Sequence, residues 1–112
     1  VIREVPRDFD RLIGFAGVGK TSIDYFIFHQ ANSYINGFLA RKLKLPEERT
    51  PTTIHKYGNT SSVSIPLTIV SELSGRLNGQ KRILLSGFGV GLTWGTAIIQ
   101  LNDCFIGEIV EV

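Results

Sequence analysis

Apolar residues recur at a helical spacing in three segments of this chain. The pattern covers residues 7–15, 31–43 and 65–77, and in each segment the apolar positions fall on one face. This periodicity predicts three amphipathic helices. Gly14 and Gly17 are predicted to break the first helix and Pro46 to stop the second, because both residue types interrupt helices.

Runs of β-branched and aromatic residues predict the strands between and after these helices. Residues 23–28 read as a buried strand, and residues 82–88 and 93–101 as two strands close enough to pair antiparallel. Residues 50–54 also read as extended, because they are rich in threonine and Pro51 disfavours a helical conformation at the residue before it. The resulting order, α-β-α-β-α-β-β, predicts an α/β fold with helices packed on a mixed sheet.

Composition narrows the classes of protein that need consideration. Of the 112 residues, 43% are hydrophobic and 20% charged, which is enough to form the core of a single domain, residues 1–112. The net charge of +2 comes without a basic stripe interleaved with aromatics, so we expect no nucleic-acid partner. Apolar runs are too short to span a membrane. Cys104 is the single cysteine, which excludes an internal disulfide and a cysteine-rich metal site and favours a reducing, cytoplasmic location.

Three polar clusters follow predicted apolar elements. They are His29-Gln30-Ala31-Asn32, Gly58-Asn59-Thr60-Ser61-Ser62 and Gly87-Phe88-Gly89-Val90-Gly91. Clefts in such sheets lie beyond the carboxyl ends of the strands, so the three clusters could line one site. A histidine, an asparagine and a backbone N–H can all donate to one oxygen, which predicts a site that stabilises an enolate or an oxyanion.

Three ordered motifs carry a resemblance to a known family. HQAN, YGNTSSVSIPL and SGFGVGLTWGTAIIQL together resemble the C-terminal half of β-ketoacyl-acyl carrier protein synthase III, over roughly residues 8–102. The resemblance implies a thiolase-like fold of two duplicated halves, each with a mixed, roughly five-stranded sheet. It also implies that the cysteine nucleophile belongs to an N-terminal half outside these residues, so we expect the chain alone to be inactive.

The resemblance further implies a decarboxylative Claisen condensation in fatty-acid or related biosynthesis. In it, His29 and Asn59 hold the malonyl thioester oxygen while carbon dioxide leaves, and the carbanion attacks an acyl group on the cysteine. The residues implied to contact the phosphopantetheine arm, the carrier protein or the acyl group are Gln30, Ala31, Asn32, Phe88, Gly89 and Val90. The implied partners are acyl carrier protein and acyl-coenzyme A as substrates, with the intact enzyme a homodimer. No metal or resident cofactor is implied.

Two positions depart from the family pattern. Val90 stands where the family commonly has the middle of three glycines, so we expect a reshaped acyl pocket. Tyr34 stands where the best-known members carry arginine, so we expect a different contact with the cofactor arm or carrier. Elsewhere we expect His55 to be structural, Cys104 an ordinary thiol and Trp94 a packing residue.

Two other functions remain as alternatives. Residues 14–21, GFAGVGKT, match the P-loop pattern GxxxxGK[ST] of nucleotide-binding proteins. A P-loop lies between a buried strand and a helix, whereas here a polar-faced helix precedes the motif and a strand follows it. The second alternative is a non-catalytic domain that uses the same fold to contact a carrier protein.

Overall fold

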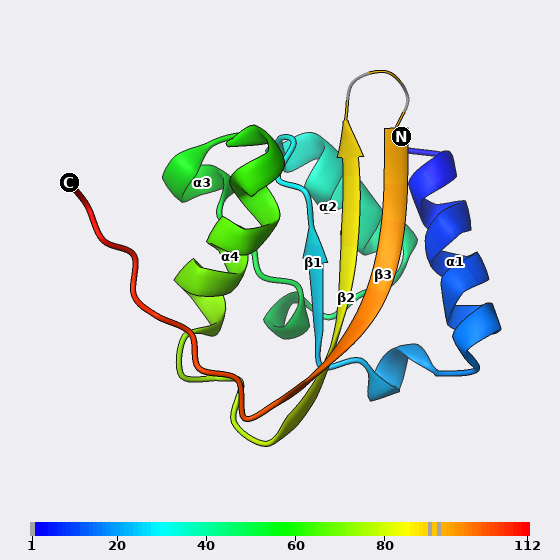
Figure 1. Cartoon of the computed structure of the whole chain (residues 1–112). Coiled ribbons are helices and arrows are strands. Elements are labelled where there is room, and N and C mark those ends of the chain that lie inside the picture. Colours follow the sequence, from blue (N-terminus) through cyan, green and yellow to red (C-terminus); the bar gives the residue numbers. More distant parts are fainter. Residues whose placement is uncertain (1, 90, 92) are drawn as a thin grey trace.

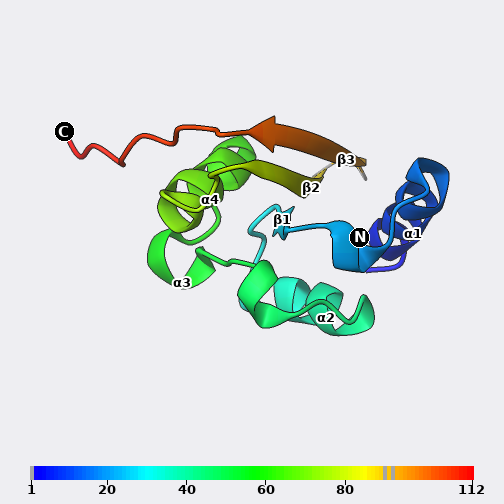
Figure 2. The ribbon, with the colours of Figure 1, turned by 90° about the horizontal axis from the view of Figure 1, so that it is seen from below.

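A central sheet separates two layers of helices (Figures 1 and 2). The computed structural model describes residues 2–89, 91 and 93–112. Its helices are α1 (Glu4–Ala16), α2 (Ser33–Lys42), α3 (Ile54–Tyr57) and α4 (Ser64–Leu73), with 3-10 turns at Lys20–Ser22, Glu47–Arg49 and Ser61–Val63. Its strands are β1 (Tyr25–Phe28), β2 (Gln80–Gly89) and β3 (Thr93–Asn102). Within the described residues, every helix falls short of the length and apolarity that a membrane crossing would need.

The sheet is mixed, as the sequence predicted. Its order is β1-β2-β3, with β1 parallel to β2 and β2 antiparallel to β3. The parallel register runs from Tyr25 opposite Ile83 to Phe28 opposite Ser86. The described residues form three strands, so the roughly five-stranded sheet implied by the family resemblance is not complete within them.

Alternation along the strands divides the core into two clusters, because successive side chains point to opposite faces of a sheet. On one face Phe26 packs with Phe9 of α1 and Leu39 of α2, and all three are fully buried. On the other face Ile27 and Ile83 pack with Leu73, at the end of α4. The two faces bury different helices, which fixes the register of β1 between them.

Local sequence signals account for most helix ends. Gly17 ends α1 in the left-handed region, with φ of 68°, and its N–H bonds the carbonyls of Ile13 and Gly14. The side chain of Asn32 caps α2 by accepting the Ile35 N–H at 2.8 Å. The helix predicted over residues 65–77 is shorter than expected and ends at Leu73, before Gly75, whose φ is 76°.

The strand predicted over residues 50–54 is wrong. Residues 51–53 form no regular element, and α3 begins at Ile54. Pro51 lacks an N–H for a ladder. The Thr53 N–H and the Thr52 hydroxyl both donate to the side-chain oxygen of Gln30, at 2.9 and 2.8 Å. A buried amide side chain therefore holds this segment in place of a strand partner.

Four buried polar side chains form one hydrogen-bonded network under the sheet edge: Gln30, Thr53, Ser64 and Thr68. Besides accepting from the segment 52–53, Gln30 donates its side-chain N–H to the Phe28 carbonyl at 2.8 Å. The Thr53 and Thr68 hydroxyls bond each other at 2.8 Å. Among the described residues, every buried side-chain nitrogen or oxygen has a hydrogen bond.

Gln30→Leu should destabilise the fold strongly. The substitution keeps the apolar bulk but leaves the Phe28 carbonyl and the Thr53 N–H without their partner, and each unsatisfied buried group costs about 1–3 kcal/mol. We expect the free energy of unfolding to fall by at least about 2 kcal/mol in urea denaturation. Gln100→Leu, at an exposed position of β3, is the matched control and should change stability by less than about 0.5 kcal/mol. Equal effects of the two changes would contradict the stabilising role of the Gln30 hydrogen bonds.

Candidate active site

A cavity of about 750 Å³ opens where β1 and β2 end, between the β2–β3 hairpin and the start of α4. Glycines help to form the hollow, because they have no side chains to fill it. A Cβ added at Gly89 or Gly95 would lie in open space, with no atom within 4 Å. At Gly87 an added Cβ would meet the Ile65 side chain at 3.8 Å. His29 and Asn59 both line this cavity, together with Phe88 and Gly89. Each of the three sequence clusters therefore contributes residues to one cavity, the first cluster through His29 alone.

His29 is held at the cavity wall by its backbone and by its ring. Its N–H donates to the Ser86 carbonyl at 2.9 Å, which continues the β1–β2 pairing by one residue. Its ring Nδ1 lies 2.7 Å from the Ser64 hydroxyl. The ring also meets Phe88 edge to face, with centroids 5.2 Å apart and an interplanar angle of 88°. Ser64 therefore engages Nδ1, and Nε2 is the second ring nitrogen, left for the Ser61 backbone or for a ligand.

Burial lowers the pKa of His29 below its ordinary value of 6.5, and a hydrogen bond with the Ser61 backbone works in the opposite direction. The net direction is downward, so the neutral form of the imidazole predominates at pH 7. A neutral ring has one N–H donor and one acceptor nitrogen. The environment therefore suits a hydrogen-bond donor rather than a fixed positive charge.

Asn59 has its amide oriented by the backbone around it. The Ser61 N–H donates to its side-chain oxygen at 2.9 Å. Its side-chain nitrogen donates to the Ala31 carbonyl at a long 3.4 Å. The oxygen is thus occupied, and the amide nitrogen, which has two hydrogens, keeps one for a ligand in the cavity.

The glycine-rich motif lies partly within the hairpin rather than wholly after a strand. β2 continues to Gly89, with Phe88 opposite Trp94 and Gly89 opposite Thr93. Val90, predicted to border an acyl site, lies outside the described residues. Trp94, predicted as a packing residue, is 41% exposed and lines the cavity.

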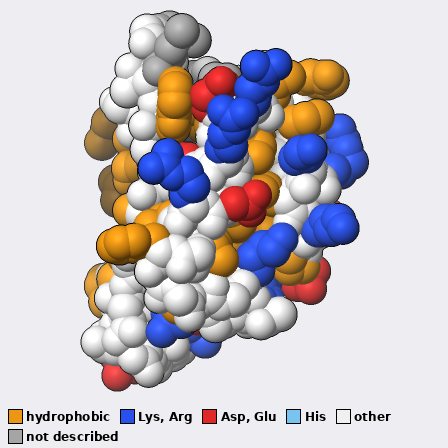
Figure 3. All heavy atoms as spheres, turned by 90° about the vertical axis from the view of Figure 1, so that its right-hand side faces the viewer, with side chains coloured by type: hydrophobic (Ala, Val, Ile, Leu, Met, Phe, Trp, Pro, Cys, Tyr) orange, Lys and Arg blue, Asp and Glu red, His pale blue; other side chains and the backbone are white. Residues whose placement is uncertain are grey.

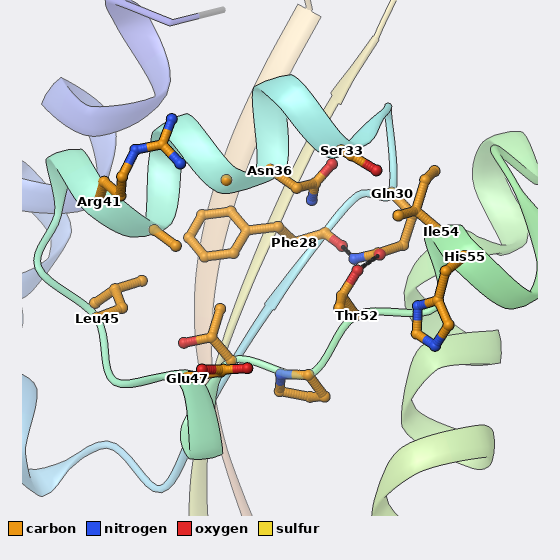
Figure 4. A pocket seen from close by; sticks show the side chains of 14 residues that line it. Phe28, Gln30, Ser33, Asn36, Arg41, Leu45, Glu47, Thr52, Ile54 and His55 are labelled. Carbon is orange, nitrogen blue, oxygen red and sulfur yellow. Dashed lines mark hydrogen bonds between the residues drawn. The ribbon is translucent and has the colours of Figure 1, made fainter.

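The three residues that follow His29 do not line this cavity. The Gln30 side chain points into a separate pocket between α2 and residues 45–55, where Figure 4 shows its bonds to Thr52 and to the Phe28 carbonyl. The Ala31 N–H donates to the side-chain oxygen of Asn36, and Asn32 caps α2. Their predicted contacts with a phosphopantetheine arm or a carrier protein stay predictions.

Ser64 is the site residue that the sequence analysis did not single out. It is 1% exposed, lines the cavity and bonds the ring of His29. The available signal was its position in a serine-rich run before an amphipathic helix, which is typical of helix starts and turns. That signal indicates a cap, and a hydroxyl aimed at a histidine 35 residues earlier requires the tertiary structure.

Cys104 lies at the opposite end of the sheet from His29. It follows β3, which runs antiparallel to β2, and its N–H bonds the Leu77 carbonyl. The ten residues of β2 extend roughly 30 Å at about 3.3 Å per residue. The Cys104 thiol is therefore outside the candidate site.

The P-loop motif has neither of its required neighbours. It begins inside α1, turns at Gly17 and leads through a short 3-10 turn into β1. The Lys20 ammonium donates to the Leu43 carbonyl at 2.7 Å. Residues 14–21 thus connect a helix to a strand, as their flanking sequence predicted, and are not a phosphate cradle.

The geometry defines a class of site: two uncharged N–H donors, from a ring and an amide, at a hollow formed by glycines. Such donors stabilise negative charge that develops on one oxygen.

The family is established by similarity. Residues 13–101 match the family described as 3-oxoacyl-[acyl-carrier-protein (ACP)] synthase III C terminal, and the chain belongs to this family. It is 39% identical over 103 residues to the β-ketoacyl-[acyl-carrier-protein] synthase III of Lactococcus lactis. That match covers 89% of this chain but 32% of the relative.

Solved structures agree. A 3-oxoacyl-(acyl-carrier protein) synthase from Burkholderia xenovorans superposes with a TM-score of 0.91 at 41% identity, over 96% of this chain and 32% of that one. The priming β-ketosynthase of the R1128 polyketide pathway gives 0.80 at 30% identity, over 91% of this chain and 31% of that one. The chain thus spans about a third of the length of these relatives, and the predicted family is confirmed.

The lowered pKa of His29 predicts a stability that declines in mild acid. The folded pKa lies below 6.5, so protons bind the unfolded chain first as pH falls. His29 therefore has no effect on stability well above pH 6.5, and destabilises the fold as pH falls through 6.5 toward the folded pKa. NMR titration of the ring in the native chain and in urea should give the lower pKa in the native chain. A higher pKa in the native chain would contradict the burial argument.

Proposed function

We propose that this chain is the C-terminal domain of a 3-oxoacyl-[acyl-carrier-protein] synthase III-type acyltransferase. The intact enzyme condenses an acyl thioester with malonyl-acyl carrier protein in fatty-acid or related biosynthesis. The observation that carries the proposal is the convergence of His29 and Asn59 on one glycine-hollowed cavity. Family membership over residues 13–101 and the printed names of the relatives support it.

His29 and Asn59 act on the malonyl half of the reaction. Their N–H groups hold the thioester oxygen while the carbon–carbon bond to the carboxylate breaks and carbon dioxide leaves. The electron pair passes onto that oxygen as an enolate, and the resulting carbanion attacks the acyl group of an acyl-cysteine and expels the thiolate. Positioned donors of this kind contribute about 2.7–4 kcal/mol each.

The acylated cysteine comes from outside these 112 residues. Cys104 is the chain's single cysteine and lies at the far end of the sheet from His29. This chain covers 32% of its Lactococcus lactis relative, which leaves room for an N-terminal half that supplies the cysteine. The proposed chemistry uses acyl-coenzyme A and a phosphopantetheine-linked malonyl group as substrates and needs no resident cofactor.

The sheet is completed to five strands in the intact enzyme. β1 and β3 each pair on one side within the described residues, so both edges are open. β3 is ten residues long and pairs with β2 on one side only, which is a long edge for a protein to leave uncovered. We assign one further strand to each edge, and pairing of two such enzymes into the homodimer through the N-terminal half.

An acidic carrier protein fits the basic end of α2. Arg41, Lys42 and Lys44 are exposed there. On the face around α1, basic side chains are spread among hydrophobic and acidic ones rather than gathered in a stripe, which suits a protein partner better than nucleic acid (Figure 3). The reaction and its carrier-bound substrates accord with a cytoplasmic location.

The decisive test separates condensation from acylation. In a chimera, these residues replace the matching C-terminal third of the Lactococcus lactis synthase. We expect His29→Ala and Asn59→Ala each to lower the condensation rate about 100- to 1,000-fold, because each removes one enolate donor. Acylation of the cysteine, followed by mass spectrometry, should persist and shows that the variants are folded.

His55→Ala and Cys104→Ser are the controls and should leave both steps unchanged. Full condensation in the His29→Ala and Asn59→Ala variants would instead support a non-catalytic, carrier-contact domain.

A further inference from the structure

We propose that Ser64 is a positioning residue that fixes the tautomer and orientation of His29. Its hydroxyl donates to Nδ1, so the ring carries its hydrogen on Nε2. The catalytic consequence rests on the proposed function, whereas the tautomer itself does not.

Distance and burial support a specific bond. The Ser64 hydroxyl lies 2.7 Å from Nδ1 and is 1% exposed, so water does not compete for it. The side chain reaches His29 from the first residue of α4, while His29 follows β1. Two separate elements therefore meet at this contact.

Counting hydrogens decides the direction of the bond. The Ser64 oxygen already accepts the Gln30 N–H at 3.3 Å. Among the contacts of the described residues, His29 Nδ1 is the one acceptor within reach of the serine's own hydrogen. If Nδ1 carried a hydrogen and donated instead, the buried hydroxyl hydrogen would have no acceptor. The arrangement that satisfies every buried group has Nδ1 as acceptor.

The surrounding network holds the Ser64 backbone through Thr68 and its hydroxyl through the Gln30 N–H. The Thr68 hydroxyl donates to the Ser64 carbonyl at 2.7 Å, and the Thr53 hydroxyl bonds Thr68 in turn. Gln30 joins the network through both its backbone and its side chain. Every one of these side chains is at most 1% exposed, so the serine cannot turn without breaking a buried bond.

The consequence for the site follows from ring geometry. With Nδ1 accepting from Ser64, the ring's one hydrogen lies on Nε2, and His29 lines the cavity together with Asn59. A histidine with the hydrogen on Nδ1 would present a lone pair there and repel the developing oxygen charge. Ser64 thus decides whether His29 is a donor or an acceptor toward the substrate.

The tautomer can be measured in the 112-residue chain itself. Ring ¹⁵N spectra near pH 8 should show His29 wholly in the Nε2–H form, with an Nδ1 shift typical of a hydrogen-bonded acceptor. Ser64→Ala should shift the Nδ1 resonance and add some Nδ1–H form, and Ser64→Thr, which keeps the hydroxyl, should restore the native pattern. An Nδ1–H ring in the native chain, or an unchanged spectrum in Ser64→Ala, would overturn the proposal.

Ser71→Ala is the matched control, because Ser71 is a serine of the same helix whose hydroxyl bonds Glu72 instead. It should leave the His29 spectrum unchanged. If Ser64→Ala does not fold, the native and Ser64→Thr spectra decide, since both must show the acceptor Nδ1.

In the chimera, Ser64→Ala should lower kcat for condensation about 10- to 100-fold with little change in KM, as loss of an orienting partner does. His29→Ala is run beside it. If kcat for condensation falls in His29→Ala but not in Ser64→Ala, the positioning role of Ser64 is wrong. If it does not fall in His29→Ala, the proposed function is wrong.

Discussion

The structure depends most on the buried hydrogen bonds that join the end of β1 to α4. Gln30 and Ser64 sit at the centre of this network, each 1% exposed. Buried polar groups are stable only when each has a partner, so the network permits one relative placement of the elements that supply them. The apolar clusters on the two faces of the sheet attract α1, α2 and α4 to it, but they are less directional. The polar bonds set the register with which α4 meets the strand.

The same constraint explains why the site lies where it does. His29 and Gln30 are consecutive in sequence and point to different surroundings, one to the cavity and the other into the network. The alternation of side chains along extended backbone makes this division possible. Because Gln30 is anchored to Thr53 on one side and Phe28 on the other, its neighbour has little freedom to move. Rigid support of this kind is what a preorganised donor needs.

Sequence reasoning succeeded where a residue's role depends on its neighbours in the chain. Helical periodicity predicted α1, α2 and α4, and Gly17 marked the end of α1, whereas Gly14, also expected to break it, lies inside the helix. It failed for residues 50–54, because threonine-rich extended backbone resembles a strand until its hydrogen-bond partners are known. Those partners lie on Gln30, more than twenty residues away.

The same distinction between local and distant determinants applies to the candidate site. Ordered motifs predicted the meeting of His29 and Asn59, and the cavity bears this out. Ser64 and the exposure of Trp94 could not be predicted, since each follows from the packing of distant elements. Gln30 shows the limit most clearly: the motif that names it does not say which way its side chain points.

The cavity and the open sheet edges lead to one further step. The cavity is lined by Trp94, which is 41% exposed, and by three glycines, so it leaves apolar surface open to solvent. β3, which pairs on one side only, borders the cavity through its first residues, Thr93, Trp94 and Gly95. Both features belong to the hairpin that borders His29. The strand pairing that holds this hairpin therefore also shapes one wall of the candidate site, so stability of the sheet edge and geometry of the site depend on the same residues.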